Sequence, residues 1–219
     1  MSSQPGFPDL GLFPLFKDLP DPLLESWKPR FIRERFAKRQ LLQFPASCPD
    51  VIFFVCSGKV KISYYSEDGK EFTVAILAAG QVYSEHSLAL ATALEETEVL
   101  YISMAEFRWM MEESPELARR LIRVLGQILR ITNDLIVDLA FREAAPRLAR
   151  VFLRMAQRSS SGDNYCVRLT HEELASLSGT TRQTVNEILR HWERQGILAL
   201  QRGQVVILNL DRLREKLNP

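Results

Sequence analysis

Short hydrophobic runs separated by turn residues dominate the first half of the chain. Between Phe31 and roughly Ile102, the runs "DVIFFVCSGKVKISYY", "EFTVAIL" and "EVLYIS" are rich in Val, Ile, Phe and Tyr. They are separated by "SGK", "EDGKE" and "AAGQ", and glycine-containing turns between β-prone runs are typical of hairpins. The pattern therefore predicts an antiparallel β module, either a sandwich or a small barrel.

The hydrophobic pattern changes to a helical period over residues 114–141. Ser114 can cap the helix, and Pro115 suits its first turn. Apolar residues then recur at alternating steps of four and three, as in the seam of a helix pair: Leu117, Leu121, Val124, Ile128, Ile131 and Leu135. A second apolar row lies on another face: Ile122, Leu125, Leu129 and Ile136. We expect this helix to pack on its own β module and to pair with a second copy, with a single buried helix in a monomer as the alternative.

A glycine stands in the interior of this long helix. Gly126 in a helix costs about 1 kcal/mol of stability relative to Ala. We therefore expect something to approach the helix closely at Gly126, either the partner helix or a flat ligand.

The pattern restarts after Phe141. The segment "REAAPRLARVFLRMAQRSS" predicts a second amphipathic helix that runs into the polar loop "SSSGDN". We place a hinge at Ala140–Arg142, so that residues 1–141 form an N-terminal domain and residues 142–219 a C-terminal domain.

The C-terminal domain carries a local helix pattern. Thr170 and Glu173 have capping-box spacing, and a short helix is expected to end at Ser178–Gly179. A longer helix begins at Thr181, with an apolar face formed by Val185, Ile188, Leu189 and Trp192. Two helices joined by a glycine-containing turn predict a helix-turn-helix, and the β-prone runs around "QRGQ" predict a hairpin wing after it.

Polar residues at the start of the longer helix point to DNA. Arg can bridge guanine O6 and N7, Gln or Asn can bridge adenine N6 and N7, and a helix N-terminus favours phosphate. The candidate DNA-binding residues are Thr181, Arg182, Gln183, Thr184 and Asn186, with Arg202 in the wing as a phosphate contact.

Charge and composition agree with this division. Residues 142–219 carry 13 Lys and Arg against 8 Asp and Glu, a net charge of +5, whereas residues 1–141 carry 15 against 19, a net charge of −4. A basic C-terminal domain favours a polyanionic partner.

The three cysteines are far apart and form no C-x-x-C pair, so we interpret them as free thiols. No apolar run is long enough to cross a bilayer and no secretion signal is present, so we expect a cytoplasmic protein.

Over nearly its full length the chain resembles the CRP/FNR superfamily of dimeric bacterial transcription regulators. The segments that carry the resemblance are "TTRQTVNEIL", and "NDLIVDLAF" followed by "RLARVFL". The resemblance implies an α+β fold with an N-terminal β-roll of the cyclic-nucleotide-binding type, a long dimerisation helix and a C-terminal winged helix-turn-helix. It further implies a homodimer that binds palindromic double-stranded DNA and contacts RNA polymerase.

Within that superfamily, members that bind cyclic nucleotides hold the cyclic phosphate with an arginine. The segment "GQVYSEHSLALATALEETEV" contains no arginine, so cyclic AMP would find no cation there. Instead, "KEFTVAILAAGQVYSEHS" and "RVLGQIL" resemble the CooA-type regulators, which sense carbon monoxide with haem b. This resemblance implies that His86 binds the haem iron and that Leu125 and Gly126 lie beside the haem. Neutral imidazole is a frequent haem ligand, in agreement with this role for His86.

The same resemblance implies a second, displaceable ligand of the iron. This would be the N-terminal amine of the other subunit, here the α-amino group of Ser2 after removal of Met1, and carbon monoxide would displace it. A cysteine that binds ferric iron in some members is replaced here by Ser84.

Two other functions are alternatives to the carbon monoxide sensor. One is a haem-free regulator of the same superfamily that responds to another small effector, and the other is a haem electron-transfer protein. No catalytic triad, paired-carboxylate motif or phosphate-binding glycine loop is present, so we expect no enzymatic activity.

Overall fold

The computed structural model describes residues 7–46, 48, 50–84, 89–158, 165–201 and 203–217. The chain divides into two compact units, one of residues 1–65 and 74–130 and the other of residues 66–73 and 131–219. No helix within the described residues has the length and apolar character needed to span a membrane.

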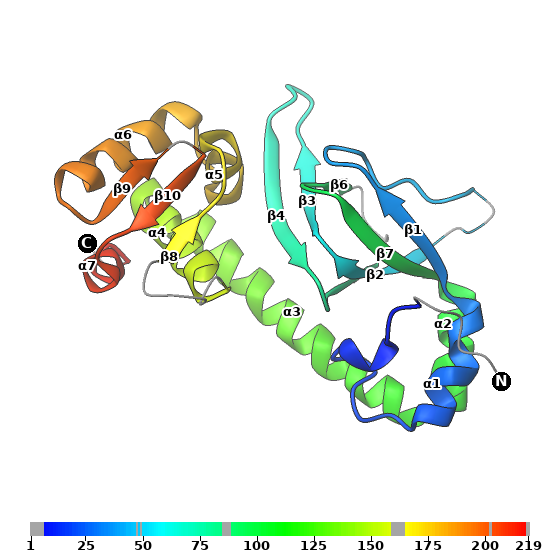
Figure 1. The fold of residues 1–219 in the computed structure, drawn as a ribbon. Helices are drawn as coiled ribbons and strands as arrows, with labels where there is room; N and C mark the ends of the chain where they lie inside the picture. Colours follow the sequence, from blue (N-terminus) through cyan, green and yellow to red (C-terminus); the bar gives the residue numbers. More distant parts are fainter. Residues whose placement is uncertain are drawn as a thin grey trace. The chain divides into compact units, whose positions relative to one another are not determined.

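Two antiparallel β-sheets form the N-terminal module (Figure 1). Their strands are β1 (Ile32–Phe36), β2 (Val51–Ser57), β3 (Lys59–Tyr65), β4 (Glu71–Ala78), β5 (Val82–Ser84), β6 (Leu90–Ala93) and β7 (Thr97–Ser103). One sheet has the order β1-β7-β2-β5 and the other β4-β3-β6. The β1–β7, β2–β7, β2–β5 and β3–β6 pairs are antiparallel. The predicted antiparallel β module is confirmed.

Strand β2 is hydrophobic at successive positions because its sheet is covered on both faces. Val51, Phe53 and Val55 contribute to one core, which also contains residues of β3 and β6. Ile52 and Phe54 contribute to a second core on the opposite face, since successive side chains of a strand alternate. A strand buried on both faces has no polar alternation, and this explains the uninterrupted run "VIFFV".

The second core is covered by the N-terminal segment and by a helix after the last strand. The covering elements are η1 (Leu10–Leu12), α1 (Asp21–Trp27), η2 (Lys28–Arg30) and α2 (Met104–Glu113). The Phe16 ring centroid lies 5.1 Å from that of Phe54 and 5.9 Å from that of Phe31. Trp27 donates a hydrogen bond of 2.7 Å from Nε1 to Oε2 of Glu113, which joins the end of α1 to the end of α2. The hydrophobic pattern had predicted neither α1 nor α2.

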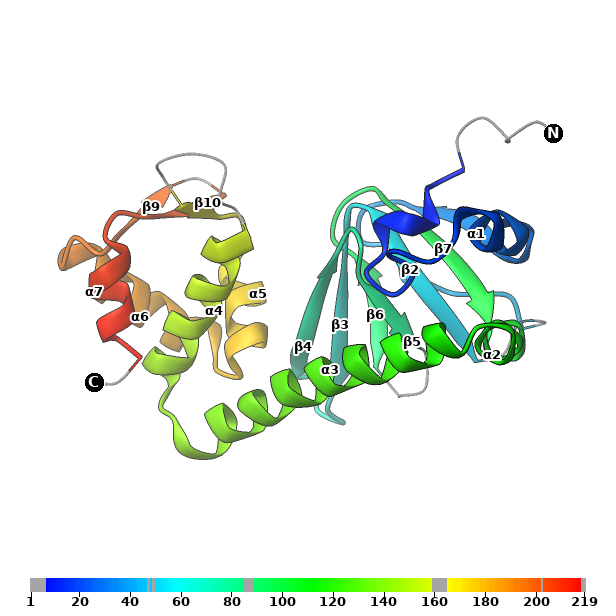
Figure 2. The same ribbon diagram turned by 90° about the horizontal axis from the view of Figure 1, so that it is seen from below.

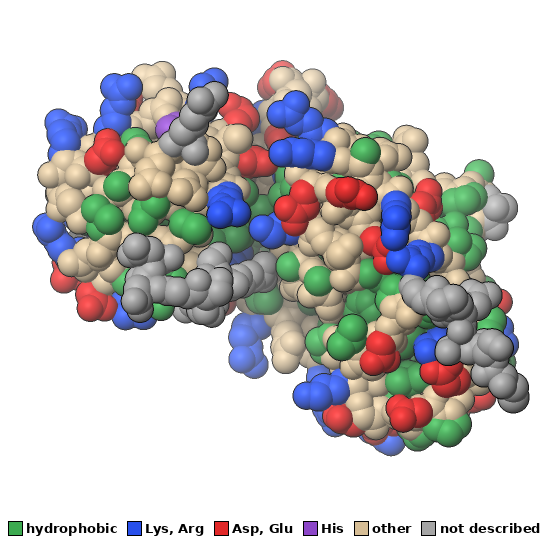
Figure 3. All heavy atoms as spheres, viewed as in Figure 1, with side chains coloured by type: hydrophobic (Ala, Val, Ile, Leu, Met, Phe, Trp, Pro, Cys, Tyr) green, Lys and Arg blue, Asp and Glu red, His purple; other side chains and the backbone are tan. Residues whose placement is uncertain are grey.

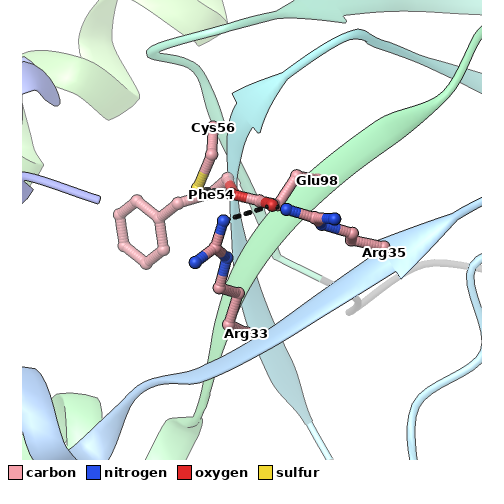
Figure 4. A network of polar contacts seen from close by, with 5 residues as sticks. All are labelled: Arg33, Arg35, Phe54, Cys56 and Glu98. Carbon is pink, nitrogen blue, oxygen red and sulfur yellow. Dashed lines mark hydrogen bonds and ion pairs between the residues drawn. The ribbon is translucent and has the colours of Figure 1, made fainter. Parts of the chain in front are cut away.

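An ion-pair cluster lies where β1 pairs with β7 (Figure 4). Glu98 Oε2 lies 2.6 Å from Arg33 Nη2 and 2.7 Å from Arg35 Nε. Partial burial raises the pKa of Glu98, but the hydrogen bonds from Arg33 and Arg35 outweigh it and hold the pKa below its ordinary value of 4.5. Beside the cluster, burial and then the charge of Glu98 raise the pKa of the Cys56 thiol to about 11, so this thiol is protonated at neutral pH. Cys56, Cys48 and Cys166 are free thiols, as predicted.

The lowered pKa of Glu98 makes part of the stability depend on pH. A carboxyl group whose pKa is lower in the folded state stabilises the fold above its unfolded pKa, and this contribution disappears as the pH falls through the folded value. We therefore expect Glu98→Gln to make the thermal midpoint fall less steeply than that of the parent between about pH 5 and about pH 3. The exposed Glu96→Gln is the control, and identical pH profiles for Glu98→Gln and the parent would contradict this interpretation.

Helix α3 (Pro115–Phe141) exists as predicted, but its apolar rows differ from the expected roles. Leu117 is 0% exposed, so it is a core residue of its own module and not part of a dimer surface. Leu121 and Val124 are half-buried against the same core. In the later turns of the helix, apolar residues of both predicted rows are exposed to solvent. The exposed apolar residues of the helix are Ile122, Leu125, Ile128, Leu129, Ile131, Ile136, Val137, Leu139 and Phe141. Leu135 is half-buried.

The C-terminal unit is a small α+β domain. Its elements are α4 (Ala144–Arg158), β8 (Tyr165–Val167), α5 (His171–Ser178), α6 (Arg182–Arg194), β9 (Leu198–Gln201), β10 (Gln204–Ile207) and α7 (Leu210–Glu215). The sheet order is β8-β10-β9, and both pairs are antiparallel. Phe152 of α4 and Trp192 of α6 meet edge to face with ring centroids 6.3 Å apart. Both rings are buried, and they join the two longest helices of this domain.

The junction between α3 and α4 is fixed by buried charge. Figure 2 shows the chain turning back between the end of α3 and the start of α4. Asp138 is 4% exposed, and its two carboxylate oxygens lie 2.9 Å from Arg142 Nε and 2.9 Å from Arg150 Nε. Residues 131–141 group with the C-terminal unit, whereas the sequence pattern places the boundary between the two domains after residue 141.

Candidate functional site

The predicted helix-turn-helix is formed by α5 and α6. Thr170 caps α5 through its side chain, and the reciprocal bond from the Thr170 backbone N–H to the Glu173 carboxylate completes the capping box. Thr181 caps α6 by accepting a hydrogen bond of 3.1 Å from the backbone N–H of Thr184. These two caps fix where each helix begins, so that the first residues of α6 are presented at an ordered helix end.

Gly179 makes the turn between the two helices. It ends α5 in the left-handed region at φ 62°, where residues with a side chain are strained. A Cβ at this position would lie 2.7 Å from Leu139 Cδ2, closer than two carbon atoms can pack. The left-handed backbone favours glycine, and any side chain here would also have to displace the end of Leu139, in agreement with the glycine-containing turn predicted from sequence.

Arg147 of α4 supports the same turn. Its guanidinium donates to three backbone carbonyl oxygens: that of Ser178 at 2.7 Å, that of Gly179 at 3.0 Å and that of Arg142 at 2.7 Å. One side chain therefore ties the turn of the helix-turn-helix to the junction after α3. No local sequence signal identified Arg147 or Asp138, because their partners are distant backbone groups and side chains.

The start of α6 exposes the predicted DNA-binding residues. Arg182 and Gln183 are exposed, and Thr184 is half-buried. Gln183 donates from Nε2 to Glu187 Oε1 at 3.1 Å. On the opposite face, Val185, Leu189 and Trp192 are buried, as the sequence predicted. Ile188, which was predicted for the same face, is half-buried. The positively charged side chains of α6 are Arg182, Arg190 and Arg194, and Figure 3 shows Lys and Arg side chains along the edge of this unit.

Asn186 differs from the other candidates because its partner lies on the other helix of the pair. It is half-buried, and its Oδ1 atom lies within hydrogen-bonding distance of Nδ1 of His171, the first residue of α5. An amide oxygen has two lone pairs, so this contact leaves one acceptor position for the adenine bridge that the sequence predicts for Asn186.

The predicted wing is confirmed by the antiparallel pair β9 and β10, in which Gln201 is opposite Gln204. The phosphate contact expected from this wing, Arg202, lies outside the described residues.

Two of the candidate sensor residues also lie outside the described residues, namely His86 and Ser2. Leu125 on α3 is 53% exposed, and a Cβ on Gly126 would meet nothing within 4 Å. The close approach expected at Gly126 is therefore not made by the described part of its own chain. The helix offers an apolar surface without a side chain at this position, and a flat group can lie against such a surface.

The described residues contain no cluster of three or more His, Cys, Asp or Glu side chains that could hold a metal ion. A haem needs no such cluster, because its iron is held by the porphyrin nitrogens and by axial ligands.

Comparisons with known proteins match both units. A cyclic nucleotide-binding domain model matches residues 33–114, and a Crp-like helix-turn-helix domain model matches residues 146–216. A CRP-like cAMP-activated global transcriptional regulator of Mycobacterium tuberculosis is 31% identical over 175 residues, which cover 75% of this chain and 78% of that protein. The cyclic AMP receptor protein of Thermus thermophilus is 30% identical over 210 residues, covering 92% of this chain and 95% of that protein.

A solved structure is also similar over nearly the whole chain. It is that of a double mutant of CooA from Carboxydothermus hydrogenoformans, with a TM-score of 0.76 and 29% identity over 95% of both chains.

Proposed function

Because the chain belongs to the CRP/FNR family of transcription regulators, we propose that it is a dimeric, haem-dependent regulator that senses carbon monoxide and binds a palindromic DNA site. The Mycobacterium tuberculosis relative is a transcriptional regulator and not an enzyme. A DNA-binding unit has no role in an electron carrier, which argues against the electron-transfer alternative.

The exposed start of α6 supports the DNA-binding half of the proposal. Arg182 and Gln183 are exposed at the N-terminal end of a capped helix, where phosphate and base edges are both accessible to a docked helix. Helix α6 would lie in the major groove with the β9–β10 wing beside the DNA backbone, and Arg202 would contact a phosphate there. Contact with RNA polymerase stays a prediction.

The exposed apolar residues of α3 support a dimer. Ile128 is 46% exposed and Ile131 52%, and a soluble monomer seldom exposes neighbouring apolar side chains along one helix face. We propose that these two residues of the predicted seam pair with the same residues of a second copy. A symmetric dimer presents two α6 helices, one to each half-site of the DNA. This explains why the DNA site would be palindromic.

The proposal that the N-terminal unit senses carbon monoxide through haem is carried by one observation, the composition of residues 80–99. This segment contains His86 but neither Lys nor Arg, so it can offer an imidazole to iron but no cation to a cyclic phosphate. Haem would supply an iron that binds a diatomic gas. His86 would hold the iron, and Leu125 and Gly126 would provide the apolar surface beside the macrocycle. The α-amino group of Ser2 of the second copy is the proposed second ligand, with which carbon monoxide would compete.

Absorption spectra test the sensor proposal. The full chain, produced with haem supplied, is expected to show a Soret band that shifts when carbon monoxide is added to the reduced protein. In His86→Ala the band should be lost or strongly altered in both states, because the protein ligand of the iron is missing. His191→Ala is the matched control and should retain the parent spectra. A His86→Ala variant with spectra identical to the parent's would refute the ligand assignment.

The names of the relatives favour a second candidate, a haem-free regulator that responds to cyclic AMP. Isothermal titration of the haem-free chain with cyclic AMP distinguishes the two. Micromolar binding together with no Soret band in the protein produced with haem would favour this second candidate. No measurable binding is expected from the lack of a cation in residues 80–99.

A further inference from the structure

We propose that Glu187 determines DNA sequence specificity by selecting cytosine as the base that it faces and by excluding guanine and thymine there. The sequence pattern had not indicated Glu187 as a DNA-binding residue. This inference rests on the proposed DNA-binding function and deepens it, because it names a base that α6 selects.

Glu187 lies on the face of α6 that is directed away from the core of its domain. It follows Gln183 by four residues, and both side chains are exposed. The hydrogen bond of 3.1 Å from Gln183 Nε2 to Glu187 Oε1 joins the two side chains on one face. One helical turn rises about 5.4 Å, and base pairs are about 3.4 Å apart. When Gln183 faces a base edge, Glu187 therefore faces the neighbouring base pairs.

The charge of Glu187 is opposite to that of its surroundings on α6. The exposed charged residues of the other sign on this helix are Arg182, Arg190 and Arg194. The other acid of α6, Glu193, accepts a hydrogen bond of 2.9 Å from the backbone N–H of Leu200 and is thereby directed to β9. Within the described residues, Glu187 has Gln183 as its partner and forms no ion pair. Docking of α6 therefore brings an uncompensated carboxylate into the groove.

A carboxylate only accepts hydrogen bonds, so the base that faces it must donate. In the major groove cytosine presents its N4 amino group, whereas guanine presents the acceptors N7 and O6 and thymine presents the acceptor O4. Adenine presents an amino group beside the acceptor N7, so it is the second choice. Guanine or thymine would leave the carboxylate removed from water without a donor, which is costly.

The bond from Gln183 does not prevent this contact with a base. A carboxylate offers about four acceptor positions on its two oxygens, and Gln183 occupies one of them. The bond restrains the Glu187 side chain on the exposed face, and the remaining positions accept from cytosine N4.

The first test is a selection of binding sites from random-sequence duplex DNA by the full chain. It is run on reduced, haem-supplied protein with and without carbon monoxide. Four proteins are compared: the parent, Glu187→Gln, Glu187→Ala and the control Glu215→Gln. Glu215 is an exposed acid on α7, so its replacement removes the same charge at a site outside α6.

We expect the parent and Glu215→Gln to select cytosine at one position of each half-site. In Glu187→Gln and Glu187→Ala the ratio of cytosine to guanine there should fall by roughly ten-fold, because an amide also donates and alanine does not contact the base. The same base preference in all four proteins overturns the inference. A higher affinity of the Glu187 variants for every sequence, with unchanged preference, also overturns it.

The second test removes the single donor that Glu187 is proposed to recognise. In the selected duplex, the cytosine at this position is replaced by pyrimidin-2-one, which is cytosine without the N4 amino group. Fluorescence anisotropy should show that the parent binds this duplex roughly ten-fold more weakly than the unmodified one, and that Glu187→Ala binds both within about two-fold. An equal loss in the parent and in Glu187→Ala overturns the inference.

These outcomes are distinct from a failure of the proposed function. If the parent selects no common sequence in either gas state, the proposed DNA-binding function fails, and the inference fails with it. If the parent and Glu187→Ala select one and the same palindromic sequence, the DNA-binding function stands and only the role of Glu187 is refuted.

Discussion

Trp192→Ala is expected to lower the free energy of unfolding of the C-terminal unit by about 3–5 kcal/mol. Trp192 is 2% exposed, and it packs against Phe152 at the centre of the domain. Truncation removes a large apolar group and leaves a cavity that rigid helices cannot fill completely. Because Trp192 anchors α6, the variant should also lose DNA binding at temperatures where the parent is folded.

Urea denaturation followed by circular dichroism measures this loss. Trp109→Ala is a matched control, because Trp109 is 39% exposed and stacks under the Arg30 guanidinium 3.7 Å from the ring centroid. Its replacement should cost about 1 kcal/mol. A loss for Trp192→Ala no larger than that of the control would show that the side chain does not anchor the domain.

Asp138→Ala is expected to destabilise the same unit by about 3 kcal/mol. The change leaves the guanidinium groups of Arg142 and Arg150 without the buried carboxylate that compensates them, and such a loss costs more than an exposed pair is worth. This value is at the lower end of the usual range for buried pairs, since each arginine side chain is about 30% exposed.

Asp211→Ala provides the comparison within the same unit. The Asp211–Arg214 pair has a similar distance of 2.8 Å, but its side chains are 85% and 57% exposed. An exposed pair contributes about 0–1 kcal/mol, so this variant should unfold close to the parent. Equal denaturation midpoints for Asp138→Ala and Asp211→Ala would contradict a structural role for the buried pair.

Local signals made much of the C-terminal unit predictable. The capping box at Thr170 and Glu173 and the glycine at Gly179 act within a few residues, so the sequence alone specifies where α5 begins and ends. The apolar face of α6 was predictable for the same reason, because Val185, Leu189 and Trp192 follow the helical period. The contact between His171 and Asn186 was not, since it joins residues on two helices.

Tertiary contacts determine the packing partners of residues that the hydrophobic pattern alone could not assign. Both rows of α3 have helical spacing, and only the packed structure shows that Leu117 faces the core of its own module. Asp138 looks like an ordinary polar residue of an amphipathic helix, but the turn into α4 places two arginines around it. A periodic pattern predicts the faces of a helix, but it does not specify what each face contacts.

The division of the chain inside α3 determines how the DNA-binding part could be isolated. A fragment that starts at residue 142 would remove Asp138 and the apolar side chain of Leu139 that lies against the Gly179 turn. A fragment that starts at Ile131 keeps both. We therefore expect the fragment that starts at Ile131 to be the shortest one that folds stably. The sequence pattern would place the start of the domain eleven residues later, at residue 142.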